Sequence, residues 1–249
     1  MTHIDSTIPA ETDILCEGCG YTLNGLPQDG RCPECGKPIA ESVGHPRIPP
    51  AWERRGALGP VAAFLKTSAE VLFHPTRFYQ TLATRRDDRA AHTFAKIWWI
   101  VTAIFFGLAA YGHTVWYVRT MLLASTFETW AALKWALPVT YIVLVYIALA
   151  FTTRLAARLT HWEASYRGLR MPLPVVLRGM YYHSVHYVPC ALVGLLTVFG
   201  YRILLERRII YLSSAERYLY VLCAEVILAA AYLFNTYWIG MRNMMYANR

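Results

Sequence analysis

Four apolar stretches, each long enough to cross a lipid bilayer, constrain this chain of 249 residues more than any other feature. They cover residues 97–118, 135–153, 180–201 and 218–241. About 20 helical residues cross a hydrocarbon core of ~30 Å, and inside that core every backbone polar group must be bonded within the protein. A soluble helical protein does not carry four such runs. The sequence therefore predicts an all-α integral membrane bundle of about four transmembrane helices within residues 96–249.

The charged residues support a membrane protein and predict its orientation. Only 16% of the residues are charged and 56% are hydrophobic, against about 25% and about 45–50% in soluble domains. Cytosolic loops are enriched in Lys and Arg, and placing the N-terminus in the cytosol puts 18 basic residues inside and 6 outside. The net charge of +8 is then explained by loop arginines that set topology, and a nucleic-acid partner is not expected.

Four cysteines near the N-terminus form two C-x-x-C pairs, Cys16 with Cys19 and Cys32 with Cys35, separated by twelve residues. Four thiolates suit tetrahedral zinc at about 2.3 Å and leave no ligand position open, which is typical of a structural site. Disulfides or unrelated thiols are one alternative, and a single iron ion is another. A reducing cytosol preserves such thiolates. We expect residues 15–40 to form a small β zinc ribbon that binds one structural Zn²⁺, which supplies most of its stability.

The other N-terminal segments are predicted from composition and periodicity. Residues 1–14 are expected to be a flexible N-terminus, and residues 41–58 a proline-rich linker that lets the ribbon reach a partner. Residues 59–95 form an interfacial amphipathic helix region. Its expected apolar face consists of Val61, Phe64, Leu65, Leu72 and Phe73. This pattern fits a helix lying in the membrane interface and equally a helix packed onto the bundle.

Two resemblances extend these expectations. The motif C-x-x-C-G-Y-x-L-x-G-L-P from Cys16, followed by R-C-P-E-C-G around Cys32, resembles the short zinc ribbon at the N-terminus of many bacterial membrane proteins. This resemblance implies a bound metal and a bacterial inner (cytoplasmic) membrane, and the charge count and the thiolates place the ribbon in the cytosol.

The second resemblance lies in the membrane part. The pattern P-x-x-F-Y-x-x-L from Pro75 before the first span, and the run Tyr181-Tyr182-His183-Ser184 leading into another, resemble the Yip family of multi-span membrane domains. That family commonly has five spans, one more than counted here. The resemblance implies a membrane-organising or partner-binding role and carries over no catalytic residues.

Three ionisable residues within the apolar stretches are candidates for chemistry inside the membrane. His183 and His186 are three residues apart and would share a helix face. Glu225 lies in the last span, where a carboxylate is costly and should face the bundle interior. The three could form a polar site that moves protons or a metal ion. Interhelical hydrogen bonds that position the helices, with Ser184 and Asn235 included, are the alternative.

The functional prediction follows from what the motifs contain and lack. No nucleophile elbow, zinc-protease or nucleotide-binding fingerprint occurs, so no catalytic residue is named. We expect a partner-binding or membrane-organising scaffold that contacts the lipid bilayer and captures a protein partner through its ribbon. The alternative is a small transporter or channel subunit that uses His183, His186 and Glu225. The sequence leaves the oligomeric state open.

Overall fold

The computed structural model describes residues 13–43, 47–84, 87–121, 131–169, 171–209 and 215–248. The described chain forms two compact units, and each is considered by itself. Unit 1 comprises Met1–Phe94, Arg154–His183 and Thr236–Arg249, and unit 2 comprises Ala95–Thr153 and Ser184–Asn235. Residues 1–12 of the expected flexible N-terminus lie outside the described residues.

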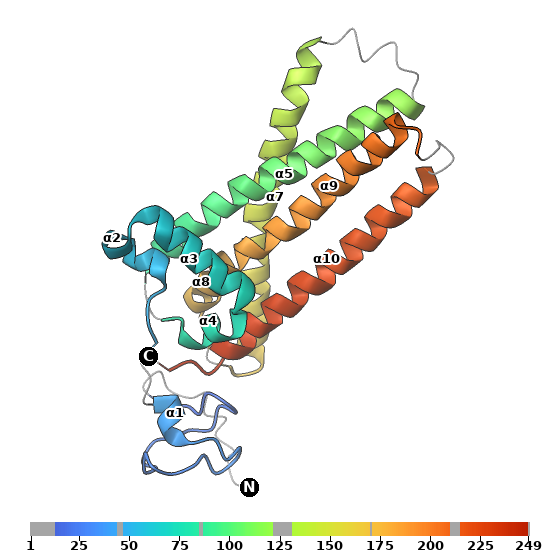
Figure 1. The fold of residues 1–249 in the computed structure, drawn as a ribbon. Coiled ribbons are helices and arrows are strands. Elements are labelled where there is room, and N and C mark those ends of the chain that lie inside the picture. Colours follow the sequence, from blue (N-terminus) through green and yellow to red (C-terminus); the bar gives the residue numbers. More distant parts are fainter. Residues whose placement is uncertain are drawn as a thin grey trace. The chain divides into compact units, whose positions relative to one another are not determined.

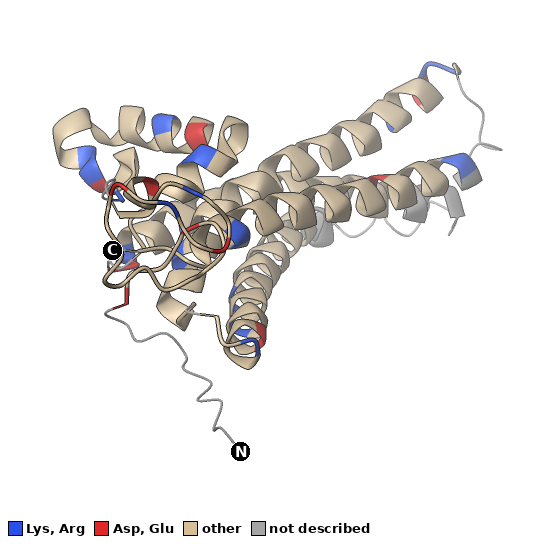
Figure 2. Cartoon of the chain, turned by 90° about the horizontal axis from the view of Figure 1, so that it is seen from below, with Lys and Arg blue, Asp and Glu red and all other residues tan. Residues whose placement is uncertain are grey.

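Four long helices dominate the chain (Figure 1). They are α5 (Arg89–Met121), α7 (Ala131–Tyr166), α9 (Tyr187–Glu206) and α10 (Ala215–Met244). Four helical segments are long and apolar enough to cross a membrane: Arg89–Trp116, Trp135–Tyr166, Leu173–Glu206 and Arg217–Met244. Lys, Arg, Asp and Glu are sparse along the long helices (Figure 2). These findings confirm the predicted all-α membrane bundle.

The third candidate span has a break that the sequence pattern does not predict. It begins with α8 (Leu173–His183), passes through a 3-10 turn, η2 (Ser184–His186), and continues as α9. Pro189 lies in the first turn of α9, where a residue without an N–H is tolerated because that turn's donors have no partner inside the helix. The 20 residues of α9 rise about 30 Å, which suffices to cross the hydrocarbon core.

In unit 2 the long helices approach one another closely at glycines. A Cβ atom on Gly107 of α5 would lie 2.6 Å from Ile142 Cγ1 and 2.9 Å from the Ile142 backbone in α7. A Cβ on Gly112 would lie 3.2 Å from a methyl of Val198 in α9. Small residues at such crossings are typical of membrane helices, where close van der Waals packing drives association.

In unit 1 short helices pack around aromatic rings and a buried ion pair. They are α1 (Ile39–Val43), η1 (Ala51–Arg54), α2 (Arg55–Leu58), α3 (Pro60–Phe73), α4 (Pro75–Thr81) and α8. Arg178 of α8 forms an ion pair with Glu53 of η1, and its side chain also donates to the carbonyl oxygens of Ala83 at 2.7 Å and Asp87 at 3.0 Å. Tyr182 donates to the same Glu53 carboxylate at 2.5 Å. These bonds connect η1, the segment before α5, and α8.

The segment expected to be a proline-rich linker contains two short helices. Within residues 41–58, η1 and α2 are helical and Trp52 is buried. The Trp52 backbone N–H donates to Thr67 Oγ1 at 2.8 Å, and its indole N–H donates to the Ala90 carbonyl at 2.7 Å. The large indole supplies apolar area, and the backbone and indole N–H groups of Trp52 anchor the segment to α3 and α5.

Candidate metal centre

The four cysteine sulfurs converge on one point. All four Sγ atoms lie within 4.8 Å of one another, with Cys16 and Cys35 at 3.5 Å and Cys19 and Cys32 at 3.6 Å. Tetrahedral zinc at about 2.3 Å from each sulfur sets the sulfurs about 3.8 Å apart, whereas a disulfide requires about 2.05 Å. All four cysteines are free thiols. The geometry therefore fits a metal ion and disagrees with the disulfide alternative.

The two cysteine pairs have the same backbone hydrogen bonds, repeated at an offset of sixteen residues. The N–H groups of Cys16 and Cys32 donate to the carbonyls of Tyr21 and Lys37, each at 2.8 Å. The glycine after each second cysteine donates back to the first cysteine, at 2.8 Å for Gly20 and 2.9 Å for Gly36. Both glycines have positive φ, +83° and +72°, a conformation that a residue without Cβ adopts at little cost. The site therefore consists of two equivalent knuckles.

The interior of this segment is small. Its buried cluster contains two cysteines, Cys16 and Cys32, and two aliphatic residues, Leu23 and Ile39, which occupy equivalent places in the two knuckles. Among the described residues the segment contains no strand, only isolated antiparallel bridges Leu15↔Thr22 and Arg31↔Pro38. The expected β character is thus reduced to one bridge per knuckle. Such a short segment buries too little apolar area to be stable alone, so a bound metal would supply much of its stability.

Hydrogen bonds also distinguish the sulfurs electrostatically. Burial by itself would raise the pKa of the Cys16 thiol, but the Gly18 and Cys19 backbone N–H groups and the neighbouring thiols lower that pKa to about 7. Burial, together with hydrogen bonds to the other thiols, raises the pKa of Cys19 to about 12. Backbone N–H groups and neighbouring thiols thus favour a thiolate within the cluster, and the thiolate is the form that binds metal.

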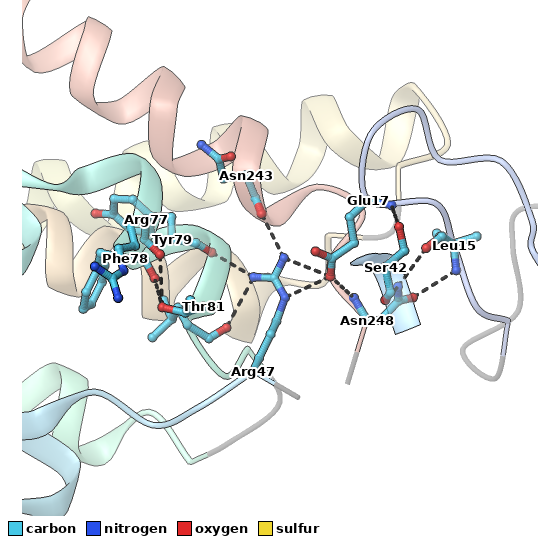
Figure 3. Close-up of polar contacts among 11 residues, drawn as sticks. Leu15, Glu17, Ser42, Arg47, Arg77, Phe78, Tyr79, Thr81, Asn243 and Asn248 are labelled. Carbon is cyan, nitrogen blue, oxygen red and sulfur yellow. Dashed lines mark hydrogen bonds and ion pairs between the residues drawn. The ribbon is translucent and has the colours of Figure 1, made fainter. Parts of the chain in front are cut away.

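The first knuckle is attached to the rest of unit 1 through Arg47 (Figure 3). The Arg47 side chain is 3% exposed, and it lies 3.1 Å from the carboxylate of Glu17, which stands between the first two cysteines. The same guanidinium donates to three carbonyl oxygens: Tyr79 at 2.8 Å, Leu82 at 3.4 Å and Asn243 at 3.1 Å. One buried cation thus joins the knuckle, the end of α4 and the end of α10.

The C-terminal residues contact the same knuckle. The Asn248 side chain donates to the carbonyls of Leu15 at 2.7 Å and Ser42 at 2.9 Å, and it accepts from the Leu15 N–H at 2.9 Å (Figure 3). A Cβ atom on Gly20 would lie 2.5 Å from the ring of Tyr246. The cysteine segment is therefore packed against the end of the chain, in contrast to the expected freely tethered ribbon.

Neither attachment is evident from the local sequence pattern. Arg47 and Glu17 read as ordinary surface charges, and Asn248 lies 233 residues from the Leu15 backbone that it bonds. The sixteen-residue repeat of the two knuckles, in contrast, is evident from the sequence. The pattern C-x-x-C-G-x-x followed by Leu23 or Ile39 recurs at the sixteen-residue offset, and this internal similarity is visible without a structure.

The intramembrane polar candidates each have a different hydroxyl partner. His183 Nε2 lies 2.9 Å from Thr236 Oγ1, and His186 Nδ1 lies 2.7 Å from the Tyr232 hydroxyl. Glu225 accepts a hydrogen bond from Thr197. Within the part of the chain that the structure describes, the four cysteines are the only group of three or more His, Cys, Asp or Glu residues that could hold a metal. The hydroxyl partners favour interhelical hydrogen bonding, and the transport alternative stays a prediction.

Comparison of the chain with protein-family models, with curated proteins and with solved structures gave no match. The resemblances to bacterial zinc-ribbon proteins and to the Yip family therefore stay predictions.

Proposed function

We propose that this protein is a membrane scaffold whose cysteine segment binds one structural zinc ion and presents a protein-binding surface in the cytosol. The observation that carries the proposal is the closed set of four convergent sulfurs, which leaves no position for a substrate or a water ligand. A metal held in this way stabilises a fold and takes no part in a reaction.

The two knuckles differ in what covers them, and this difference supports a binding role. The first knuckle contacts Tyr246 and Asn248, as described above. In the second knuckle Pro33, Glu34 and Cys35 are exposed. A rigid, metal-held turn can bind a partner without paying the ordering entropy of a flexible loop. We infer that the second knuckle is the partner-facing surface.

The composition of unit 1 supports a cytosolic headpiece. It contains the three segments that the charge count assigns to the cytosol: the N-terminal region, the connection after α7 and the C-terminus. Contacts within the unit join the adjoining ends of the spans, since Arg154 of α7 donates to His92 of α5 at 3.1 Å and Thr160 Oγ1 of α7 lies 2.7 Å from the Tyr237 hydroxyl of α10. Three segments on one side require an even number of crossings between them, as four spans provide. The bacterial inner membrane follows from the resemblance alone.

The metal is tested first. We expect the full-length protein purified in detergent to contain one zinc ion per chain, and the Cys32→Ser variant to contain less than about a tenth of that. Zinc is measured by inductively coupled plasma mass spectrometry. A stoichiometric iron content in place of zinc, or a metal-free wild type with four reactive thiols, would contradict the zinc assignment.

The binding surface is tested separately, in native membranes. A photocrosslinking amino acid at the exposed Pro33 should capture one protein species, and the same group at the exposed Arg167 provides the control. Capture should be lost in Cys32→Ser. Because that variant unfolds the segment, Glu34→Lys is the second variant, and it should keep its zinc while it captures less. If Cys32→Ser abolishes zinc and leaves capture unchanged, the segment is not the binding module.

A further inference from the structure

The outward face of α3 is more apolar than that expected for a helix covered by water. Its inward face is made of small or polar residues: Ala63, Thr67, Ser68 and Val71 are buried. Its large aliphatic and aromatic side chains point outward, with exposed fractions of 70% for Val61, 60% for Leu65 and 75% for Phe73. Of the expected apolar face, Val61, Leu65 and Phe73 are exposed, whereas Phe64 and Leu72 are half-buried.

Phe64 lies on the inner side of α3 and anchors the helix to the start of the first span. Its ring centroid lies 5.6 Å from that of Trp52 and 5.2 Å from that of Phe94 in α5. Phe94 lies two turns or fewer from Arg89, where the first candidate span begins. This contact puts α3 beside the end of a membrane-spanning helix, at the level where lipid headgroups are found.

The outward face of α3 has only one charge. The exposed residues from the end of α2 to the end of α3 are Leu58, Gly59, Pro60, Val61, Ala62, Leu65, Lys66, Ala69 and Phe73. A contiguous apolar face of this kind is costly in water and is stabilised when it enters the boundary between headgroups and acyl chains. A single lysine at its edge can extend toward the headgroups while its methylenes remain in the apolar layer.

A basic cavity opens where this apolar face ends. It has a volume of about 240 Å³, and its lining includes Arg54, Glu70, His74, Arg77 and Phe78. His74 directly follows Phe73 in the chain. In the described part of the chain, neither Arg54 nor Arg77 forms an ion pair, although Glu70 lines the same cavity. Two uncommitted guanidinium groups beside an apolar surface match a lipid that carries an anionic phosphate.

We propose that α3 lies in the membrane interface with its Val61–Leu65–Phe73 face in the lipid, and that the cavity between Arg54 and Arg77 binds the phosphate of an anionic phospholipid. The acyl chains of the lipid would run along Phe73 while the headgroup enters the cavity. A bound lipid would then hold the short helices of unit 1 at the bilayer, in addition to their chain connections to the spanning helices. This site is independent of the cysteine segment.

The apolar face is tested by photocrosslinking in lipid nanodiscs. p-Benzoylphenylalanine replaces Leu65, and the same group replaces Leu228, 69% exposed on α10, as the positive control and Asp29, exposed in the turn between the knuckles, as the negative control. Lipid adducts, identified by mass spectrometry, are expected at Leu65 and Leu228 and not at Asp29. Adducts at Leu228 without adducts at Leu65 would overturn the interfacial placement.

The cavity is tested by native mass spectrometry of the full chain titrated with phosphatidylglycerol or phosphatidylcholine. Each basic residue near an anionic lipid contributes about fivefold in affinity, so the double variant Arg54→Gln, Arg77→Gln should bind phosphatidylglycerol roughly 25-fold more weakly. The control variant Arg158→Gln, Arg208→Gln removes the same charge elsewhere and should bind as the wild type does.

Three results would overturn the headgroup assignment. One is unchanged phosphatidylglycerol binding in the cavity variant, and another is equal binding of the two lipids by the wild type. The third is inorganic phosphate that binds the wild type and not the cavity variant while lipid binding is unaffected, because the ligand would then be a soluble anion.

Discussion

Replacement of Glu17 by alanine tests how the cysteine segment is held against the C-terminus. The Glu17 carboxylate accepts from Arg47 Nε at 3.1 Å and from the Asn248 backbone N–H at 3.2 Å, and Arg47 Nη2 lies 3.1 Å from it. Without this carboxylate Arg47 remains a buried cation whose described acceptors are the three backbone carbonyls. The contact between the knuckle and the C-terminal residues should weaken as a result.

The expected magnitude follows from the burial of the pair. Removing one partner of a fully buried ion pair costs about 3–5 kcal/mol. Here the Glu17 side chain is 17% exposed and three carbonyls continue to bind Arg47, so the loss is closer to that of one charged hydrogen bond, about 2 kcal/mol. Since about 1.4 kcal/mol corresponds to a factor of ten, the open population of this contact should increase about 30-fold.

Hydrogen exchange measured by mass spectrometry reports that opening. The informative amide is that of Leu15, which donates to Asn248 Oδ1 at 2.9 Å and does not touch the mutated side chain. Its exchange should become about 30-fold faster in Glu17→Ala, while amides in the middle of α10 serve as an internal reference. Glu41→Ala, an exposed residue of α1, is the matched control. Leu15 exchange within threefold of wild type, or an equal effect in the control, would refute the role assigned to Arg47.

Three further predictions concern other contacts. Gly20→Ala and Gly36→Ala impose a similar positive-φ strain of about 1–2 kcal/mol, but only the Cβ added at position 20 meets an aromatic ring, that of Tyr246. Zinc loss to a chelator should therefore be ~10-fold faster in Gly20→Ala than in Gly36→Ala. Equal rates would argue against contact with the C-terminal segment. Arg178→Met leaves the buried Glu53 carboxylate with the Tyr182 hydroxyl as its described partner, and unit 1 should lose about 3 kcal/mol of stability. The thermal unfolding midpoint in detergent should fall as a result. A midpoint unchanged within error would show that the Arg178–Glu53 ion pair is not buried in the purified protein. Glu225→Gln keeps an acceptor for its hydroxyl partner, so proton and zinc flux in reconstituted vesicles should match the wild type; a changed flux would support the transporter alternative.

The membrane architecture could be predicted because its signals are local. Each span requires a continuous apolar run, and the four runs remain apolar whatever their neighbours are. The metal centre is local as well, since Cys16 and Cys19 lie within one turn and so do Cys32 and Cys35. Bringing two such turns together requires only a short connecting segment. These parts of the prediction depended on spacing alone.

The faces of the N-terminal helices could not be predicted in the same way. Helical periodicity separates two faces of α3. It cannot say which face packs against protein, because in a membrane protein an apolar face can be covered either by protein or by lipid. Phe64 faces inward because Trp52 and Phe94 are there to receive it, and both rings come from other elements. The neighbouring Leu65 faces outward and is 60% exposed.

The sequence by itself determined that the chain enters a membrane as four helices and that four thiols can share one metal ion. Both follow from short-range physics: hydrocarbon length matches a run of about 20 residues, and C-x-x-C turns bring sulfur atoms together locally. The tertiary structure alone decided that the four-cysteine segment is fastened to the other end of the chain. That decision rests on Arg47, which can be buried only because Glu17 and the carbonyls of Tyr79 and Asn243 converge on it. Such convergence joins residues nearly 200 positions apart and has no signature in local spacing.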